Sequence, residues 1–217
     1  FSDQDDIWHE DKIKKAIAKL AKVSSNTPAL YCARTEIVDA TAKNVLCNSP
    51  LFSRPPSFKN ALVQSIGGGN TMVFNKPAKN LIKNFSLNLD VIHHDWWIYQ
   101  IISGAGGYIF WDSEPCLKYR QHDSNLTGSN NSWQARLIRI RKLLQGHFRK
   151  WCEINVKMLL KNKHLLTNSN QKVLDDFIKA RQSNFFMRLF LFKRSGIYRQ
   201  TLLGNLGLIL GILFNKV

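Results

Sequence analysis

Carboxylate side chains crowd the first residues of the chain. Asp3, Asp5 and Asp6 fall within four residues, directly before Ile7 and Trp8. Carboxylates this close repel one another unless a cation lies among them, and hard divalent ions are held by one or two carboxylates while phosphate oxygens complete the shell. In an extended segment Asp3 and Asp5 project to the same side. The stretch predicts a Mg²⁺ or Mn²⁺ site, and the simpler alternative is a solvated acidic loop that caps the next helix.

Asp95 is a second candidate for chemistry. It directly precedes Trp96, the first residue of a strongly apolar run that continues to Ile102 and predicts a helix. A carboxylate at a buried helix start can act as a general base, because partial loss of water raises its proton affinity. The structural alternative is an N-cap that accepts backbone N–H bonds. The two roles are compatible, since capping would also hold the carboxylate still.

Arg120 and His122 are candidates for holding a diphosphate and a metal. Arginine suits bidentate contact with phosphate, and imidazole is a competent metal ligand. A single histidine after a strand is more often structural or exposed, and that alternative stays open. The polar loop at 123–132 has a composition suited to a lid that orders on binding.

The elements that must position these residues alternate between helices and strands, which predicts an α/β fold. Three consecutive glycines, Gly67 to Gly69, let the backbone approach a ligand closely or adopt positive φ, although a simple tight turn explains them as well. Along the first expected helix the apolar residues recur at helical spacing, with lysines on the other, solvated face. The expected elements are a helix at 12–23 with Ile13, Ala16, Ile17 and Leu20 buried, a strand at 29–33, an irregular loop at 39–60, a strand at 71–74, a helix at 96–102 and a strand at 108–111.

Four short stretches, in the same order, resemble family-two glycosyltransferases, especially the bacterial rhamnosyltransferase branch. Each stretch alone is weak, whereas four in register over residues 1–128 carry weight. They are Ser-Asp-Gln-Asp-Asp-Ile-Trp at 2–8 followed by Lys12, Gly-Gly-Asn-Thr-Met-Val-Phe-Asn at 68–75, His-His-Asp-Trp-Trp at 93–97 and Tyr-Arg-Gln-His at 119–122. The resemblance implies the C-terminal part of a GT-A fold, preceded in the whole enzyme by a nucleotide-binding half.

The resemblance also implies roles for individual residues. It implies an inverting transfer of a sugar, possibly rhamnose, from a nucleotide-diphosphate donor to a saccharide or lipid-linked acceptor in surface polysaccharide synthesis. Asp95 would be the catalytic base, supported by His94 where related enzymes often carry Glu. The implied metal ligands are Asp5, Asp3 and His122; the donor diphosphate would meet Asp3, Asp5, Arg120 and His122; the acceptor and sugar pocket would include Gly69, Asn70, Thr71, Trp96 and Trp97.

The positive charge is concentrated at the C-terminal end. The 217 residues carry a net charge of +16, and residues 134–217 hold 17 of the 31 basic residues but only 3 of the 15 acidic ones. We therefore expect two parts: residues 1–133 as the metal and acceptor half of the transferase domain, and residues 134–217 as a basic, amphipathic helical extension. Helices are expected at 134–164 and 170–183.

The apolar run at 202–214 has thirteen residues, and a bilayer span needs about twenty. A helix lying in the membrane interface, with basic residues toward anionic headgroups, is the favoured prediction. It implies a peripheral enzyme on the cytoplasmic face of the bacterial inner membrane, and four cysteines without paired spacing suit that reducing compartment. Three alternatives remain: tail helices that pack on the missing N-terminal, nucleotide-binding half, a basic nucleic-acid-binding protein, and a non-catalytic helical membrane protein. The aliphatic runs and the lack of a nucleic-acid motif disfavour the second.

Overall fold

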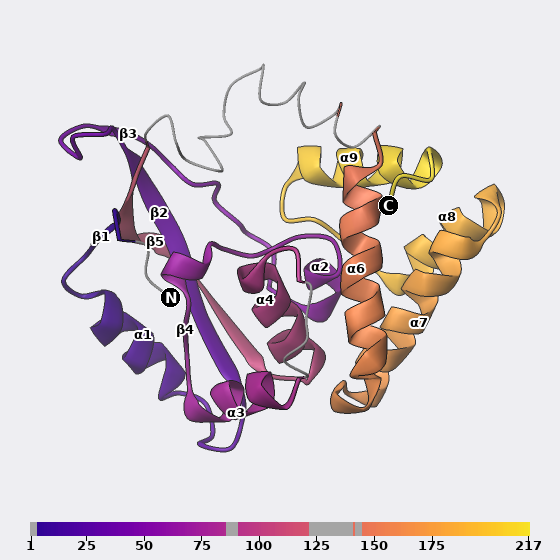
Figure 1. The fold of residues 1–217 in the computed structure, drawn as a ribbon, viewed down its shortest axis with the longest axis horizontal. Helices are drawn as coiled ribbons and strands as arrows, with labels where there is room; N and C mark the ends of the chain where they lie inside the picture. The colour runs from indigo at the N-terminus through magenta and orange to yellow at the C-terminus, as the bar shows by residue number, and fades with distance from the viewer. Residues whose placement is uncertain (1–3, 86–90, 122–140, 142–144) are drawn as a thin grey trace.

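The computed structural model describes residues 4–85, 91–121, 141 and 145–217, and it shows a mixed α/β protein (Figure 1). The predicted α/β class is confirmed. In chain order the elements are β1 (Ile7–Trp8), α1 (Lys12–Leu20), β2 (Ala29–Val38), β3 (Val45–Asn48), α2 (Phe58–Ala61), η1 (Gly69–Thr71), β4 (Val73–Phe74), α3 (Lys76–Asn84), α4 (His94–Gly104), β5 (Tyr108–Arg120), α6 (His147–Lys161), η2 (Lys163–Leu165), α7 (Asn168–Gln182), α8 (Phe185–Ser195) and α9 (Leu202–Leu213).

The described strands form one mixed sheet in the order β1-β5-β2-β3, and β4 also pairs with β2. The central strands β2 and β5 are parallel, and the other pairs are antiparallel. Both central strands are longer than predicted, because the expected strands at 29–33 and 108–111 continue to Val38 and Arg120. The register shifts where Arg34 faces Pro115, and such an irregularity tolerates a proline that cannot donate to the ladder.

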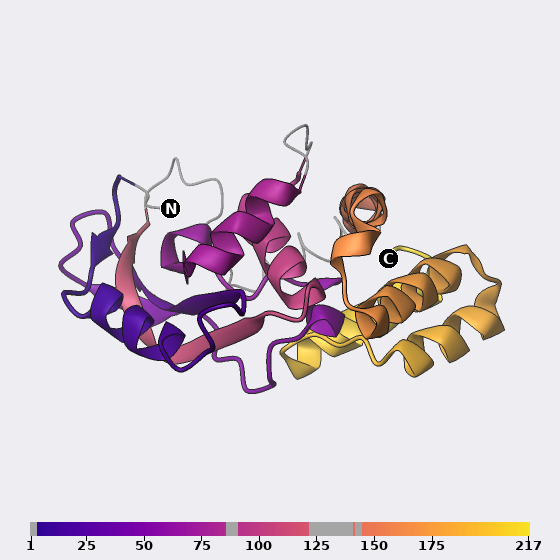
Figure 2. The ribbon, with the colours of Figure 1, turned by 90° about the horizontal axis from the view of Figure 1, so that it is seen from below.

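β2 is buried on both faces, and each face meets a different set of helices. Leu30 and Cys32 pack with α3 and α4, whereas Tyr31 and Ala33 pack with Ala16 of α1. Side chains alternate along a strand, so one short apolar run fills both cores. Figure 2 shows α1 on one side of the sheet and α3 and α4 on the other.

The expected loop at 39–60 is more regular than its Asn, Ser and Pro content predicted. β3 pairs with β2 within it, and α2 begins near its end at Phe58, where the Ser57 hydroxyl accepts a hydrogen bond from the Asn60 N–H. β3 forms because its backbone pairs with the edge of β2. The residue preferences of a segment do not reveal such a partner strand, so the sequence did not predict β3.

The C-terminal helices share a hydrophobic core with α2 and α4. This core joins Phe58, Leu62 and Trp97 to Leu159, Phe177 and Ile212, among other residues. The described part of the expected helix at 134–164 is α6, and the expected helix at 170–183 is α7. The predicted boundary at residue 133 lies outside the described residues and stays a prediction.

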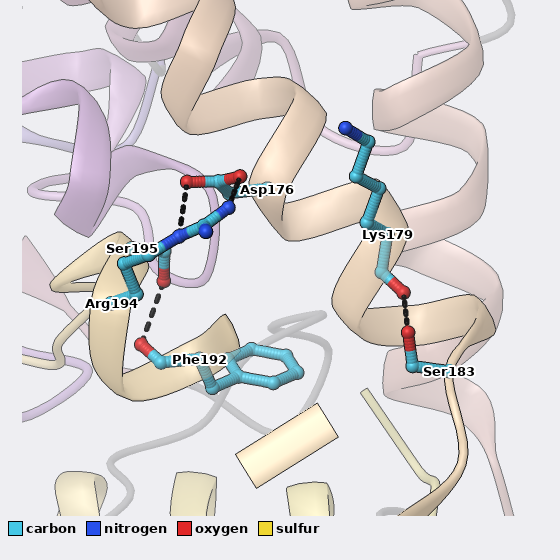
Figure 3. A network of polar contacts seen from close by, with 6 residues as sticks. All are labelled: Asp176, Lys179, Ser183, Phe192, Arg194 and Ser195. Atoms are coloured by element: carbon cyan, nitrogen blue, oxygen red, sulfur yellow. Dashed lines mark hydrogen bonds and ion pairs between the residues drawn. The ribbon is translucent and has the colours of Figure 1, made fainter. Parts of the chain in front are cut away.

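A helical hairpin of α7 and α8 forms the outer part of the tail (Figure 1). The Arg194 guanidinium forms a two-pronged ion pair with the Asp176 carboxylate (Figure 3). The Phe177 and Phe192 rings pack edge to face, with centroids 5.7 Å apart. The Ser183 and Ser195 hydroxyls bond carbonyls of the preceding turn. These contacts fix the hairpin before α9 begins.

A polar network ties the segment between α8 and α9 to the start of α2. The buried Asn60 side chain donates to the Tyr198 carbonyl at 3.0 Å and accepts hydrogen bonds from Tyr99 and Gln200. The Ser57 hydroxyl also bonds the Tyr198 hydroxyl. Because these groups are satisfied by one another, the tail fixes the end of the loop that leads into α2.

Candidate active site

The glycine loop, Gly67 to Asn70, lies at the centre of the candidate site. A Cβ atom at Gly68 would come within 2.7 Å of the Asn70 amide oxygen, and one at Gly69 would come within 2.3 Å of His94 Nε2. Gly68 has an ordinary extended backbone with φ −74°. Close approach of side chains, and not positive φ, is therefore what requires glycine at these two positions.

Two groups from the N-terminal region hold the other side of this loop. The Asp6 carboxylate accepts a hydrogen bond from Asn70 Nδ2 at 2.6 Å, and the Lys12 ammonium donates to the Asn70 carbonyl at 2.6 Å. Lys12 is only 1% exposed, and its Nζ lies 3.6 Å from the centre of the Trp8 ring. The carbonyl and the aromatic face both stabilise the buried charge. The acidic stretch thus contacts the glycine loop directly.

The burial of Lys12 reverses the prediction for α1. The lysines were expected to be solvated and Ile13 and Ile17 to be buried, yet Ile13 is 39% exposed and Ile17 59% exposed, while Lys12 and Ala16 are buried. Lys12 and Ala16 are four residues apart and share one helix face. The buried face of α1 is therefore rotated from the one that hydropathy alone selects.

Asp95 is the second residue of α4, which begins at His94. The N-cap position belongs to His93, whose side chain makes no capping hydrogen bond, so the alternative of Asp95 as the N-cap is wrong. Asp95 Oδ1 instead accepts a hydrogen bond from the Trp96 backbone N–H at 2.7 Å. A carboxylate in the first turn is also favoured by the helix dipole. These interactions hold the carboxylate at the helix start.

Asp95 lines a pocket of about 270 Å³ beside the glycine loop. Its wall combines apolar and aromatic side chains with three hydroxyls and backbone of the glycine loop, which is the usual make-up of a small-molecule site. The lining residues are Ala33, Thr35, Ser49, Pro50, Phe52, Ser65, Ile66, Gly67, Gly68, Asp95 and Trp111.

The β1–β5 ladder brings the acidic stretch to the end of β5. Ile7 pairs with Lys118 in antiparallel register, so the residues before Ile7 and the residues after Lys118 leave the ladder at the same end. Arg120, the last residue of β5, is therefore on the side of Asp5. Asp5 is half-buried in a turn and not in an extended segment, so the predicted alternation does not apply to it. Asp3 and His122, the other predicted metal ligands, lie outside the described residues.

Thr71, Trp96 and Trp97 were predicted in the acceptor and sugar pocket, and the structure places all three in the interior. The Trp96 indole donates to the Ala61 carbonyl at 2.6 Å, and the Trp97 ring packs edge to face on Phe85. The fully buried Thr71 hydroxyl donates to a carbonyl of the glycine loop. These three side chains stabilise the glycine loop and α4 from the protein interior, and they do not line the pocket described above.

Sequence reasoning missed Phe52 and Trp111 as site residues. Their ring centroids are 5.0 Å apart, and both rings line the pocket with Asp95. Trp111 belonged to a predicted strand and Phe52 to a predicted irregular loop. No local signal marks them as partners, because their meeting depends on how the loop at 49–57 folds over the sheet.

The buried thiols are poor candidates for nucleophiles. Burial raises the pKa of Cys116 to about 11 and the pKa of Cys152 to about 12. Burial also raises the pKa of Cys32, which packs near the pocket wall. Because the thiolate is the reactive form, these side chains stay protonated and unreactive at neutral pH. Chemistry at this site therefore falls to carboxylates and imidazole.

Comparison with known proteins gives one informative relative. No protein-family model matches the chain, and no solved structure matches it significantly. The dTDP-rhamnosyl transferase RfbG of Shigella flexneri is 31% identical over 161 residues, which cover 69% of this chain and 52% of the relative. The chain is glycosyltransferase-like. It spans about half the length of this curated relative.

The contribution of the Lys12–Asn70 hydrogen bond to stability can be measured. Lys12→Met keeps the apolar stem but leaves the Asn70 carbonyl without this donor, so we expect the free energy of unfolding to fall by about 1–3 kcal/mol. Lys14→Met, on the exposed face of the same helix, should change it by less than about 0.5 kcal/mol. Urea unfolding followed by circular dichroism measures both values, and equal stability of the two variants would contradict the assignment.

Proposed function

We propose that the chain is part of a GT-A-type, inverting, divalent-metal-dependent glycosyltransferase of surface polysaccharide synthesis. The donor is a nucleotide-diphosphate sugar, with dTDP-rhamnose suggested by the relative, and the acceptor is a saccharide or a lipid-linked saccharide. One observation carries the proposal: the acidic stretch, the glycine loop and Asp95 belong to one connected set of contacts beside a pocket.

The residues at the N-terminal end suit a divalent ion bound together with a diphosphate. Magnesium sites of this kind use one or two carboxylates and leave the remaining positions to phosphate oxygens and water. Within the residues that the structure describes, no cluster of three His, Cys, Asp or Glu side chains is found. Asp6 is engaged by Asn70, so Asp5 and Asp3 would hold the ion, with His122 as the further ligand. The ion would neutralise charge on the departing diphosphate.

The protein's own residues perform the remaining steps. Asp95 takes the proton from the acceptor hydroxyl as the oxygen attacks the anomeric carbon, and the bond to the diphosphate oxygen breaks on the opposite face. A single displacement of this kind inverts the anomeric configuration. Arg120 stabilises the negative charge of the leaving diphosphate through its guanidinium. His94, packed against Gly69, positions the start of α4 relative to the loop.

The base role predicts a specific kinetic defect. Asp95→Asn keeps an oxygen that can accept the Trp96 N–H bond but cannot take a proton, so kcat should fall by about 10²–10⁴-fold. Release of nucleoside diphosphate from dTDP-rhamnose by the full-length enzyme measures the rate, and donor affinity should be unchanged. Glu153→Gln, which neutralises an exposed carboxylate on α6, is the matched control. Retained turnover in Asp95→Asn would exclude this residue as the base.

The metal role predicts a metal-dependent defect in binding. Asp5→Ala should weaken binding of dTDP by about tenfold or more in the presence of Mn²⁺, and should have no effect in the presence of EDTA. Isothermal titration with and without the metal separates the two conditions. Asp11→Ala removes a surface carboxylate paired with Lys15 and should leave binding unchanged. An equal loss with and without Mn²⁺ would refute metal coordination by Asp5.

The tail has a second role in the proposal, which is binding to an anionic membrane surface. Five apolar side chains lie exposed on one face of α9, led by Leu202 at 90% exposed, and Phe214, directly after the helix, is 61% exposed. Phe186 of α8 is 82% exposed. The opposite face of α9 is buried through Leu208 and Ile212. Among the described residues no helix is long and apolar enough to cross a bilayer. An apolar face next to a strongly basic segment suits the interface of an anionic bilayer.

Membrane binding should depend on the exposed face of α9. Leu203→Gln combined with Leu206→Gln should weaken sedimentation with phosphatidylglycerol vesicles by about tenfold or more, because two leucines lose their burial in the interface. Leu46→Gln with Leu51→Gln changes two equally exposed leucines elsewhere and should have no effect. High salt should weaken wild-type binding.

Unchanged sedimentation of the α9 variant would contradict the membrane role of this face. Retention of nucleic acid in preference to anionic vesicles would instead support the nucleic-acid-binding alternative.

A further inference from the structure

We propose that the Phe52–Trp111 pair forms the binding platform for one sugar ring of the acceptor. The pair lines the pocket that also contains Asp95. This inference rests on the proposed function, because it identifies the class of molecule that Asp95 deprotonates. It assigns the specificity for the acceptor to two aromatic residues that come from a loop and from β5.

The two rings offer the kind of surface that a pyranose ring recognises. Their centroids are 5.0 Å apart and their planes are inclined by 34°, so together they form a shallow aromatic wall. One face of a pyranose carries C–H groups, which pack favourably on an aromatic surface, while its hydroxyls point outward. In this pocket the outward hydroxyls meet the side chains of Thr35, Ser49 and Ser65.

The Trp111 indole also carries a polar group, its ring N–H. Its Nε1–H is buried and has no hydrogen-bond partner in the part of the chain that the structure describes. Tryptophan in a protein interior usually finds an acceptor for this donor. Because this nitrogen is covered by protein atoms, an acceptor from a ligand can reach it only if the ring or the loop at 49–57 shifts on binding.

The volume of the pocket limits what can enter it. At about 270 Å³ it lies just below the range for small-molecule sites, roughly 300–1,000 Å³. It therefore accepts about one sugar ring, and the rest of a longer acceptor extends outside. Asp95 lines the same pocket, so its carboxylate would lie beside a hydroxyl of that ring.

The platform is held by the tail as well as by the sheet. Trp111 packs against Gly67, whose Cβ position is 3.6 Å from the indole ring. The loop that carries Phe52 continues to Arg54, whose N–H donates to the Gln200 side chain at 3.2 Å, and to Pro55, whose carbonyl accepts from the Tyr198 hydroxyl. The aromatic wall is therefore positioned by contacts on both sides.

The test measures binding of simple glycosides without a donor. Saturation-transfer NMR and calorimetry with methyl α-L-rhamnoside and methyl β-D-glucoside, on the full-length protein, should detect binding of at least one glycoside, and sorbitol should not bind. Phe52→Leu keeps an apolar side chain but removes the ring, and it should weaken binding about fivefold or more. Phe52→Tyr should restore wild-type affinity. Tyr108→Ala, which removes an exposed ring at the start of β5 that does not line the pocket, is the control.

Trp111→Phe keeps an aromatic face but reduces its area, so its affinity should lie between those of the wild type and Phe52→Leu. Equal affinity in the wild type and Phe52→Leu, or binding of sorbitol as tight as that of the glycosides, would overturn the platform. Asp95→Asn should still bind the glycosides. If Phe52→Leu binds glycosides as the wild type does while Asp95→Asn loses turnover, only this inference is refuted. If the glycosides bind as predicted while Asp95→Asn keeps its turnover, only the proposed reaction is refuted.

Discussion

Asn70 is held from one side by two N-terminal residues, and the glycine before it is in contact with α4 on the other side. Asp6 accepts from the Asn70 amide and Lys12 donates to its carbonyl, both at 2.6 Å. Gly69 lies so close to His94 that no side chain fits between them. The distance between the acidic stretch and the start of α4 is therefore set by one short loop. The candidate site depends on that constraint, because the acidic stretch and Asp95 are connected through the glycine loop and not through a shared helix or strand pair.

A buried lysine is an unusual way to fix a loop, because an ammonium loses most of its hydration in the interior. Here the Asn70 carbonyl and the Trp8 ring compensate for that loss. The positive charge also lies close to the acidic stretch, where it reduces repulsion among the carboxylates. On the other side of the site, α4 is held by a core that includes the tail helices. The tail therefore contributes to the rigidity of the site besides presenting an exposed apolar face.

The sequence was informative where a local pattern decides the structure. The apolar run at 96–102 gave α4, and the short apolar run at 29–33 gave the buried part of β2, because hydropathy and chain direction suffice for such elements. β3 and the second half of β5 escaped prediction because their partner strands, and not their own residues, stabilise them. The burial of Lys12 was not predicted for a related reason. Its hydrogen-bond partner Asn70 is 58 positions away in the sequence, so no local pattern indicates the contact.

The candidate site was predictable in part for the same physical reason. Asp95 was found from its place before an apolar helix, and the acidic stretch from its charge density. Phe52 and Trp111 were not found, because an aromatic pair from a loop and a strand has no signature in either segment. For Gly68 and Gly69 the sequence left two reasons for glycine open, a positive φ or the close approach of a neighbouring group. The structure shows that close approach is the reason.

The central claim is that the acidic stretch, the glycine loop and the start of α4 surround one cation-binding region. Paramagnetic broadening by Mn²⁺ tests it most directly, in an amide NMR spectrum of the full-length protein with dTDP present. The account predicts that the signals of Asp5, Asn70 and Asp95 broaden together at stoichiometric Mn²⁺, while signals of α8 persist. Broadening confined to the acidic stretch, with Asn70 and Asp95 unaffected, would contradict it.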